Sequence, residues 1–128
     1  MRVLLDTHVF LWFILDDTRL GRRALEVIED PANEILISPA TFWEIAIKIS
    51  LGKYALPEAY EPFIESQMAV NGFQVLPILS KHTALLTEMP FHHRDPFDRL
   101  LIAQAKIEDI GLVSVDPRLD AYGIHRVW

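Results

Sequence analysis

Hydrophobic residues in this chain occur either in short unbroken runs or at the spacing of helical turns. The runs at 3–5, 35–37 and 112–115 contain almost no polar residue. Such runs are typical of strands that are buried on both faces of a parallel sheet. We therefore predict strands at these positions, a further strand over 73–76, and a more polar edge strand over 124–128.

Helical segments are predicted between these strands. Ser38-Pro39 and Asp95-Pro96 each place a capping residue before a proline, which is a strong helix start. Gly52 is expected to end the helix that begins at Pro39, and Gly111 the helix that begins at Asp95-Pro96. Pro62 leaves the first turn of one helix undefined. The predicted helices cover 8–15, 19–30, 39–51, 58–70, 80–88 and 95–109, with a helical turn over 118–122.

The regular alternation of strands and helices indicates parallel strands joined by right-handed crossovers. We predict an α/β three-layer sandwich with a mostly parallel central sheet of four to five strands and helices on both faces. The 128 residues contain no linker, repeat or low-complexity tract. A single domain over residues 1–128 is therefore expected.

Composition narrows the possible functions. The chain has no cysteine, which excludes disulfides and thiolate metal sites, and its net charge of −6 gives no overall basic surface for nucleic acid. Clustered acids that bind divalent cations would still permit a nucleic-acid enzyme. The apolar run before Asp6 is too short for a signal peptide, and no segment approaches the length of a membrane span. We expect a cytoplasmic protein.

Two acidic residues directly follow predicted strands. Asp6 ends the first strand, and Asp116 ends the strand over 112–115. In open α/β sheets, ligands bind at the carboxyl ends of the strands. Aspartate at such a position can equally cap a helix or start a turn. Taken singly, each residue leaves both interpretations open.

Two further acids lie within predicted helices. Glu44 is surrounded by large apolar residues, so it is expected either to pair with Lys48 or to take part in a buried site. Asp98 shares a helix face with apolar residues that should pack on the sheet, so its carboxylate should point inward. Asp95 occupies the capping position of the same helix, and capping explains it fully.

Together, Asp6, Glu44, Asp98 and Asp116 can converge on one edge of the sheet. Carboxylates that share a pocket must raise their pKa values or bind cations. A site made of oxygen ligands alone suits Mg²⁺ or Mn²⁺, and such sites often hydrolyse phosphodiesters. The histidines show no zinc spacing, and the rings of the adjacent His92 and His93 need not converge. We expect the other three, His8, His82 and His125, to be packing or surface groups.

The acidic motifs resemble those of PIN-domain ribonucleases. They are Leu4-Leu5-Asp6-Thr7, Glu44, the segment from Asp98 to Ala105, and Val113-Ser114-Val115-Asp116. Their order and spacing, over essentially the whole chain, are similar to those of the VapC-type toxins of toxin–antitoxin pairs.

The resemblance implies a Mg²⁺- or Mn²⁺-dependent endoribonuclease toxin that acts on RNA, forms a homodimer and is inhibited by a cognate antitoxin. By match, Asp6, Glu44, Asp98 and Asp116 are the catalytic residues and metal ligands. Four further residues are expected to contact substrate: Thr7, Arg94, Arg99 and Ser114. We expect an arginine of the antitoxin to block the acidic site, because a guanidinium pairs well with carboxylates.

A homodimer also fits the large number of bulky apolar residues. Six of them are more than one small sheet is expected to cover: Trp12, Phe13, Trp43, Ile49, Tyr54 and Tyr60.

Two alternatives remain open. A receiver-type phosphoacceptor domain has this length and also binds Mg²⁺, but it should carry an acidic pair after the first strand and a late strand-end lysine. Here Asp6 precedes Thr7, and Lys106 lies in a predicted helix. A non-catalytic PIN-fold binding module would be expected to have lost one or more acids.

Overall fold

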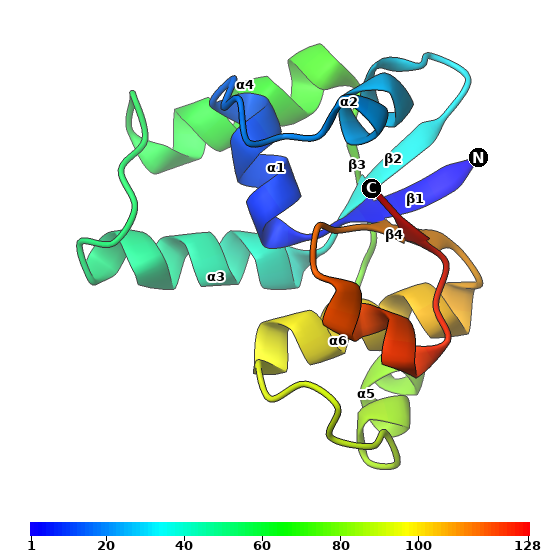
Figure 1. Ribbon diagram of the computed structural model, residues 1–128. Helices are drawn as coiled ribbons and strands as arrows, with labels where there is room; N and C mark the ends of the chain where they lie inside the picture. The colour runs from blue at the N-terminus through cyan, green and yellow to red at the C-terminus, as the bar shows by residue number, and fades with distance from the viewer.

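A five-stranded, all-parallel sheet forms the centre of the computed structural model, which describes residues 1–128 (Figure 1). The strand order is β3-β2-β1-β4-β5. The prediction of an α/β sandwich with a parallel sheet is thus confirmed. The strands are β1 (Arg2–Leu5), β2 (Glu34–Ile37), β3 (Gln74–Val75), β4 (Gly111–Val113) and β5 (Arg126–Val127).

The central strand β1 explains why the sheet has two cores. Leu4 pairs in register with Leu36 of β2 and Leu112 of β4. These three side chains belong to one hydrophobic cluster, whereas Val3 and Leu5 belong to the cluster on the opposite face. Successive side chains of a strand point to opposite faces, so an unbroken apolar run supplies both cores at once.

Helices cover both faces of the sheet (Figure 1). The cluster that includes Val3 and Leu5 packs against α1, α2 and α4, and the cluster around Leu4 packs against α5, α6 and the 3₁₀ helix η1. No helix is long and apolar enough to cross a membrane. The helices are α1 (Thr7–Ile14), α2 (Arg22–Glu29), α3 (Pro39–Ser50), α4 (Tyr60–Asn71), α5 (Ser80–Leu86), α6 (Pro96–Glu108) and η1 (Pro117–Tyr122).

The two predicted cap-then-proline starts are confirmed. The Ser38 hydroxyl accepts a hydrogen bond from the backbone N–H of Ala40 at 3.1 Å and begins α3. Asp95 accepts from the backbone N–H groups of Phe97 and Asp98 and begins α6. Both caps satisfy donors that the helix itself leaves unpaired.

Two predicted boundaries were wrong. The helix expected from residue 19 begins at Arg22, because Asp17 bonds to the backbone and guanidinium of Arg19 in a local turn and does not cap the helix. Asp109, with φ 54°, ends α6, and Gly111 instead begins β4. A Cβ on Gly111 would lie 3.3 Å from Val3 Cγ1, so close strand packing explains this glycine.

The sheet order argues against a receiver domain. Flavodoxin-like receiver folds have the order 2-1-3-4-5, whereas this chain has β3-β2-β1-β4-β5. Lys106 lies in α6 and donates a hydrogen bond to the carbonyl of Tyr122 at 2.7 Å, so it is not at a strand end.

The bulky residues that suggested a dimer are largely used inside the monomer. Trp43 is 63% exposed and is the exception. Trp12 lies against the ring of Trp128, with a centroid distance of 6.1 Å. The other four pack, partly buried, on the core: Phe13, Ile49, Tyr54 and Tyr60.

The left-handed C-cap of α6 yields a stability prediction. Asp109→Gly should raise the free energy of unfolding by about 0.5–1 kcal/mol, because glycine adopts positive φ without strain and the change removes a negative charge from a helix C-terminus. Thermal or urea unfolding measures this. The control Glu65→Gly, in the exposed interior of α4, should lower stability by about 1 kcal/mol. Destabilisation by Asp109→Gly would show that its carboxylate has an unrecognised stabilising role.

Candidate active site

The topology of the sheet brings strand ends from both halves of the chain together. From β1 the chain adds β2 and β3 on one side, and later β4 and β5 on the other. The order therefore reverses between β1 and β4, and such a switch point is the usual ligand-binding crevice of an α/β sheet. Asp6 lies there, and its backbone N–H donates to the carbonyl of Val113 at the end of β4 at 3.1 Å.

Asp6 is both a helix cap and a buried acid. One carboxylate oxygen accepts from the backbone N–H of Val9 at 2.8 Å, which begins α1. The residue is only 6% exposed. Burial raises the pKa of Asp6, although the hydrogen bonds from Ser114 and Val9 act in the opposite direction. The capping and site interpretations are therefore compatible.

Glu44 lies on α3 and is 3% exposed. Its Oε2 pairs with the ammonium group of Lys48 at 3.4 Å, so the predicted helix pair exists. Its Oε1 is buried and has no hydrogen-bond partner. A buried carboxylate oxygen without a donor is costly, which indicates that a cation or a hydrogen-bond donor belongs there.

Asp98 lies in the first turn of α6 and has a strongly raised pKa. Burial, and next the negative charges of the neighbouring acids, together raise the pKa of Asp98 to about 7; those acids are Asp95, Asp6, Glu44 and Asp116. The predicted acids thus lie close enough to act on one another. A carboxyl group with this pKa holds a proton at neutral pH for much of the time.

Asp116 has a different environment. Both of its oxygens accept hydrogen bonds from the guanidinium of Arg118, the shortest at 2.8 Å. These bonds lower the pKa of Asp116 to about 2. Asp116 also caps η1 by accepting from the Arg118 backbone N–H. The negative charge of Asp116 is therefore neutralised within the protein by the guanidinium of Arg118.

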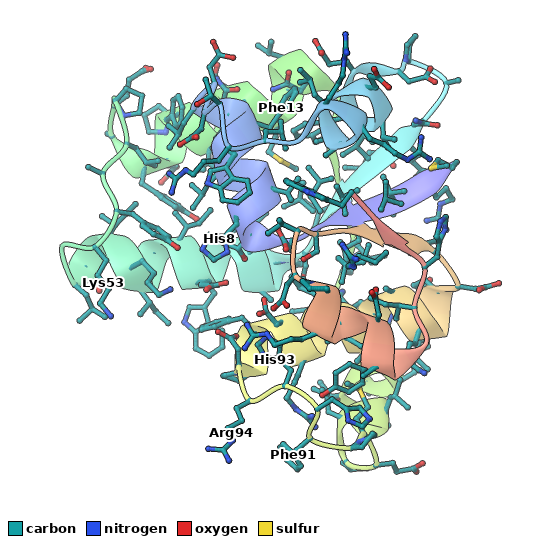
Figure 2. All side chains as sticks on the ribbon, in the orientation of Figure 1. His8, Phe13, Lys53, Phe91, His93 and Arg94 are labelled. Carbon is teal, nitrogen blue, oxygen red and sulfur yellow. The ribbon has the colours of Figure 1, made fainter.

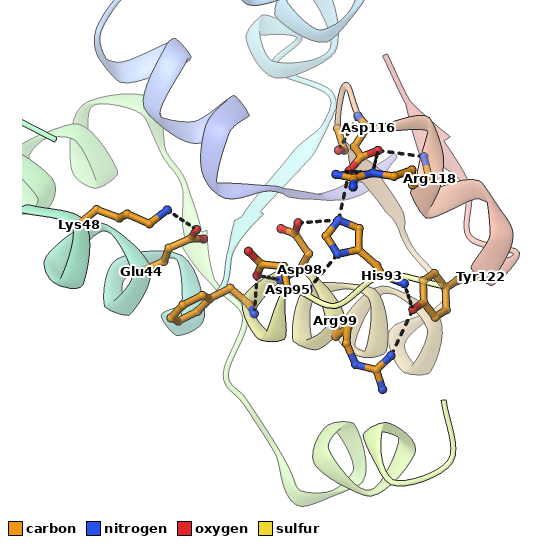
Figure 3. A network of polar contacts seen from close by, with 11 residues as sticks. Glu44, Lys48, His93, Asp95, Asp98, Arg99, Asp116, Arg118 and Tyr122 are labelled. Atoms are coloured by element: carbon orange, nitrogen blue, oxygen red, sulfur yellow. Dashed lines mark hydrogen bonds and ion pairs between the residues drawn. The ribbon is translucent and has the colours of Figure 1, made fainter. Parts of the chain in front are cut away.

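His93 is part of the site, although the sequence offered no assignment for it beyond the absence of zinc spacing (Figure 3). Its Nε2 lies 3.2 Å from Asp116 Oδ2 and 3.3 Å from Asp98 Oδ2, and the residue is 8% exposed. One potential ligand atom from each of these three residues lies within 4.8 Å of the others. His93 occupies a loop without periodicity, so no pattern in the sequence pointed to it.

The expected substrate contacts have different positions. Thr7 is buried, and its hydroxyl lies 3.3 Å from that of Thr41. Ser114 is also buried, accepts from the backbone N–H of Asp116, and hydrogen-bonds Asp6. Arg94 is exposed and projects from the loop away from the fold (Figure 2).

Arg99 requires a correction, because we expected its guanidinium to hold phosphate. It is 5% exposed. Its guanidinium donates to the carbonyls of Pro90 and Met89 and to the hydroxyl of Tyr122. It also lies over the ring of Phe91, 4.0 Å from the centroid. These contacts fasten the loop that carries His93 to α6, so Arg99 has a structural position.

The acidic residues fit a hard divalent cation. Carboxylate oxygens are the ligands that Mg²⁺ and Mn²⁺ favour. The unpaired Oε1 of Glu44 and the raised pKa of Asp98 both show negative charge that the chain does not neutralise. Asp6 retains one oxygen that does not cap α1. These three residues, with Asp116, would hold such an ion.

A parallel sheet of this order, with acids from both sides of its switch point, defines an α/β domain with an acidic crevice at the carboxyl ends of its strands. The PIN domain family model matches residues 3–124. The chain belongs to the PIN domain family.

Known proteins support this assignment. A segment of 58 residues is 38% identical to Ribonuclease VapC16 of Mycobacterium tuberculosis, and it spans 45% of this chain and 41% of that protein. The chain therefore matches less than half the length of this relative. The resemblance to VapC proteins that the motifs suggested agrees with this match.

Solved structures share the fold at low sequence identity. VapBC2 from Rickettsia felis bound to a promoter DNA fragment aligns with a TM-score of 0.72 at 16% identity, covering 98% of this chain and 97% of that one. FitAcB from Neisseria gonorrhoeae aligns with a TM-score of 0.65 at 16% identity, covering 97% and 95%. VapBC-1 from nontypeable Haemophilus influenzae aligns with a TM-score of 0.64 at 17% identity, covering 98% and 96%.

The pKa of Asp98 generates a pH prediction for the metal-free protein. The folded state has a pKa of about 7, whereas the ordinary value is 3.8. Between these values the folded state binds more protons than the unfolded state, so stability falls as pH rises from about 4 to 7. Asp98→Asn removes this loss. It should stabilise the chelated protein by about 2 kcal/mol at pH 8 and hardly at all at pH 4.

Urea unfolding of both proteins across this pH range measures the difference. Asp109→Asn, at the far end of α6, serves as the control; removing its charge from the exposed helix end should give a much smaller gain than Asp98→Asn at pH 8. A loss of stability in Asp98→Asn at pH 8 would mean that the carboxylate stabilises the fold.

Proposed function

We propose that the protein is a Mg²⁺- or Mn²⁺-dependent endoribonuclease that acts as the toxin of a toxin–antitoxin pair. The observation that carries this proposal is the acidic cluster at the switch point, where burial and the charges of four neighbouring carboxylates together raise the pKa of Asp98 to about 7. Membership of the PIN domain family and the partial match to Ribonuclease VapC16 support it.

The chain's own residues would prepare the site for phosphodiester hydrolysis. Asp6, Glu44, Asp98 and Asp116 would hold the divalent cation, which when bound lowers the pKa of water and stabilises charge on the phosphoryl group. The backbone of Val9 fixes the orientation of Asp6, and Arg118 fixes that of Asp116. Ser114 connects these two acids across β1 and β4. The site is thereby largely organised before substrate arrives.

The exposed Arg94 is our candidate for a phosphate contact on the substrate. Thr7 and Ser114 are both buried, so we propose that they help to fix the positions of the acids and do not contact the substrate directly.

A non-catalytic PIN-fold binding module is the alternative. The presence of all four acids, with one buried carboxylate oxygen lacking a partner, favours catalysis. A binding module would have no reason to retain such unfavourable charge.

Nuclease activity is tested with a defined RNA ladder. We expect cleavage with Mg²⁺ or Mn²⁺ and none after chelation. Asp6→Asn and Asp98→Asn should each lower the rate roughly a hundredfold or more, because each removes a charged ligand. Asn at position 6 still offers an oxygen to cap α1, so folding should survive.

The matched control is Asp109→Asn, which removes one aspartate from the other end of α6, about 16 Å along the helix axis. It should leave the cleavage rate unchanged. Undiminished cleavage by both Asp6→Asn and Asp98→Asn would contradict the proposed site, and the absence of cleavage with either metal would favour the binding module.

We further propose a cognate antitoxin as the cytoplasmic partner. A groove of about 280 Å³ lies between α1 and the segment after α3. Its lining includes Trp12 and Tyr54, the cations Arg19 and Lys53, and His8. An apolar segment with acidic flanks would fit this surface.

We also propose that the protein forms a homodimer. Of the six bulky residues that suggested a dimer, only Trp43 is still exposed and free to contribute to its interface. Light scattering of the purified protein measures the oligomeric state.

The inhibition prediction concerns the antitoxin's charge. An arginine in its C-terminal segment should pair with the unneutralised acids and exclude the cation. The antitoxin is first identified by selecting, from the genome of the source organism, a gene that relieves the growth arrest caused by expressing this protein. Changing the critical arginine to alanine should leave the complex intact while nuclease activity returns at high Mg²⁺. If no single arginine change restores activity in an intact complex, the block is steric.

A further inference from the structure

The position of His93 in the site is compatible with two different roles, that of a metal ligand and that of a residue that orients the metal-binding acids. With Asp98 and Asp116, it forms a group of three possible metal ligands. We infer instead that His93 is a positioning residue, which the backbone holds in a single tautomer so that its Nε2–H binds and orients the acids. This inference rests on the proposed function for the role of those acids.

The tautomer follows from the contact on the other ring nitrogen. The backbone N–H of Asp95 donates to His93 Nδ1 at 3.1 Å. A backbone amide can only donate, so Nδ1 must present its lone pair, and the ring proton lies on Nε2. The cap that Asp95 forms on α6 fixes the position of this amide.

The imidazole is also held from its own backbone. The N–H of His93 donates to the hydroxyl of Tyr122 at 2.9 Å. The same hydroxyl accepts from the guanidinium of Arg99 at 3.2 Å. Buried groups from α6 and η1 therefore fix the loop, and the ring has little freedom to rotate.

The proton on Nε2 points into the acidic cluster. His93 Nε2 is within hydrogen-bonding distance of Asp116 Oδ2 at 3.2 Å, and Asp98 Oδ2 lies 3.3 Å away (Figure 3). Asp116 is already fixed by Arg118, whereas the Asp98 carboxylate has no other ion-pair partner. His93 thus links the neutralised acid to the one that is not neutralised.

Direct ligation by His93 would require this arrangement to be reversed. Nε2 would have to lose its proton, and Nδ1 would gain it opposite the Asp95 amide. The existing hydrogen bond would then become a repulsive contact between two donors. Donors that surround metal ligands usually fix ligand orientation, and their loss weakens metal binding about 10- to 100-fold.

The direct test is ¹⁵N NMR of the His93 imidazole, first in the chelated protein and then with Mg²⁺. We expect a protonated Nε2 and an unprotonated Nδ1 in both states. In parallel, pulsed electron paramagnetic resonance of the Mn²⁺-loaded protein should show no directly bound nitrogen. A protonated Nδ1 in the chelated protein, loss of the Nε2 proton with Mg²⁺, or a Mn²⁺-bound histidine nitrogen would overturn the inference.

Two substitutions separate the two ring nitrogens. His93→Asn retains an acceptor near the position of Nδ1 but removes the donor. His93→Gln retains an amide donor near the position of Nε2 but removes the acceptor. We expect His93→Asn to weaken Mn²⁺ binding about 10- to 100-fold, and His93→Gln to recover part of that loss. Equal losses in both folded variants would contradict a donor role.

His92→Gln is the matched control, because the exposed neighbouring ring contacts Tyr122 and not the acids. It should leave Mn²⁺ affinity unchanged. The NMR arm needs no catalytic activity. A protein with the expected tautomer and Mn²⁺ affinity but no RNA cleavage would sink the proposed nuclease function and leave the inference standing.

Discussion

Mutual repulsion among buried carboxylates is the constraint on which this site depends. Acids at the carboxyl end of a sheet lose hydration and raise one another's pKa values, and Asp98 shows the combined result. The fold limits this cost by giving several acids a second task. Asp6 caps α1, Asp95 caps α6 and Asp116 caps η1. Backbone donors at helix starts thereby offset part of the charge.

This double use explains an ambiguity in the sequence. Asp6 and Asp116 could each be interpreted as a cap or as part of a site, and the structure shows that the two interpretations do not compete. One oxygen of Asp6 accepts from Val9, and the other remains for the crevice. A carboxylate has enough acceptor capacity for both tasks. Helix starts at strand ends are therefore efficient places to hold functional acids.

The sequence predicted the parts of the molecule that follow from local patterns. The apolar runs located the strands, the cap-then-proline pairs located α3 and α6, and strand alternation implied which acids share an edge. His93 and Arg118 could not be found this way. Their partners lie far along the chain or depend on the shape of a loop, and a single histidine or arginine has no periodicity. Arg99 was misassigned for the same reason, because its burial depends on Phe91 and Tyr122.

The distribution of neutralising groups determines where the site can act. Arg118 neutralises Asp116, and Lys48 pairs with one oxygen of Glu44. The unneutralised charge is thus left between Glu44 Oε1 and Asp98, one on α3 and the other on α6. A cation or a donor that enters there relieves repulsion from both helices at once. Because Arg118 and Lys48 flank this position without filling it, the fold directs added positive charge to one point on the sheet edge.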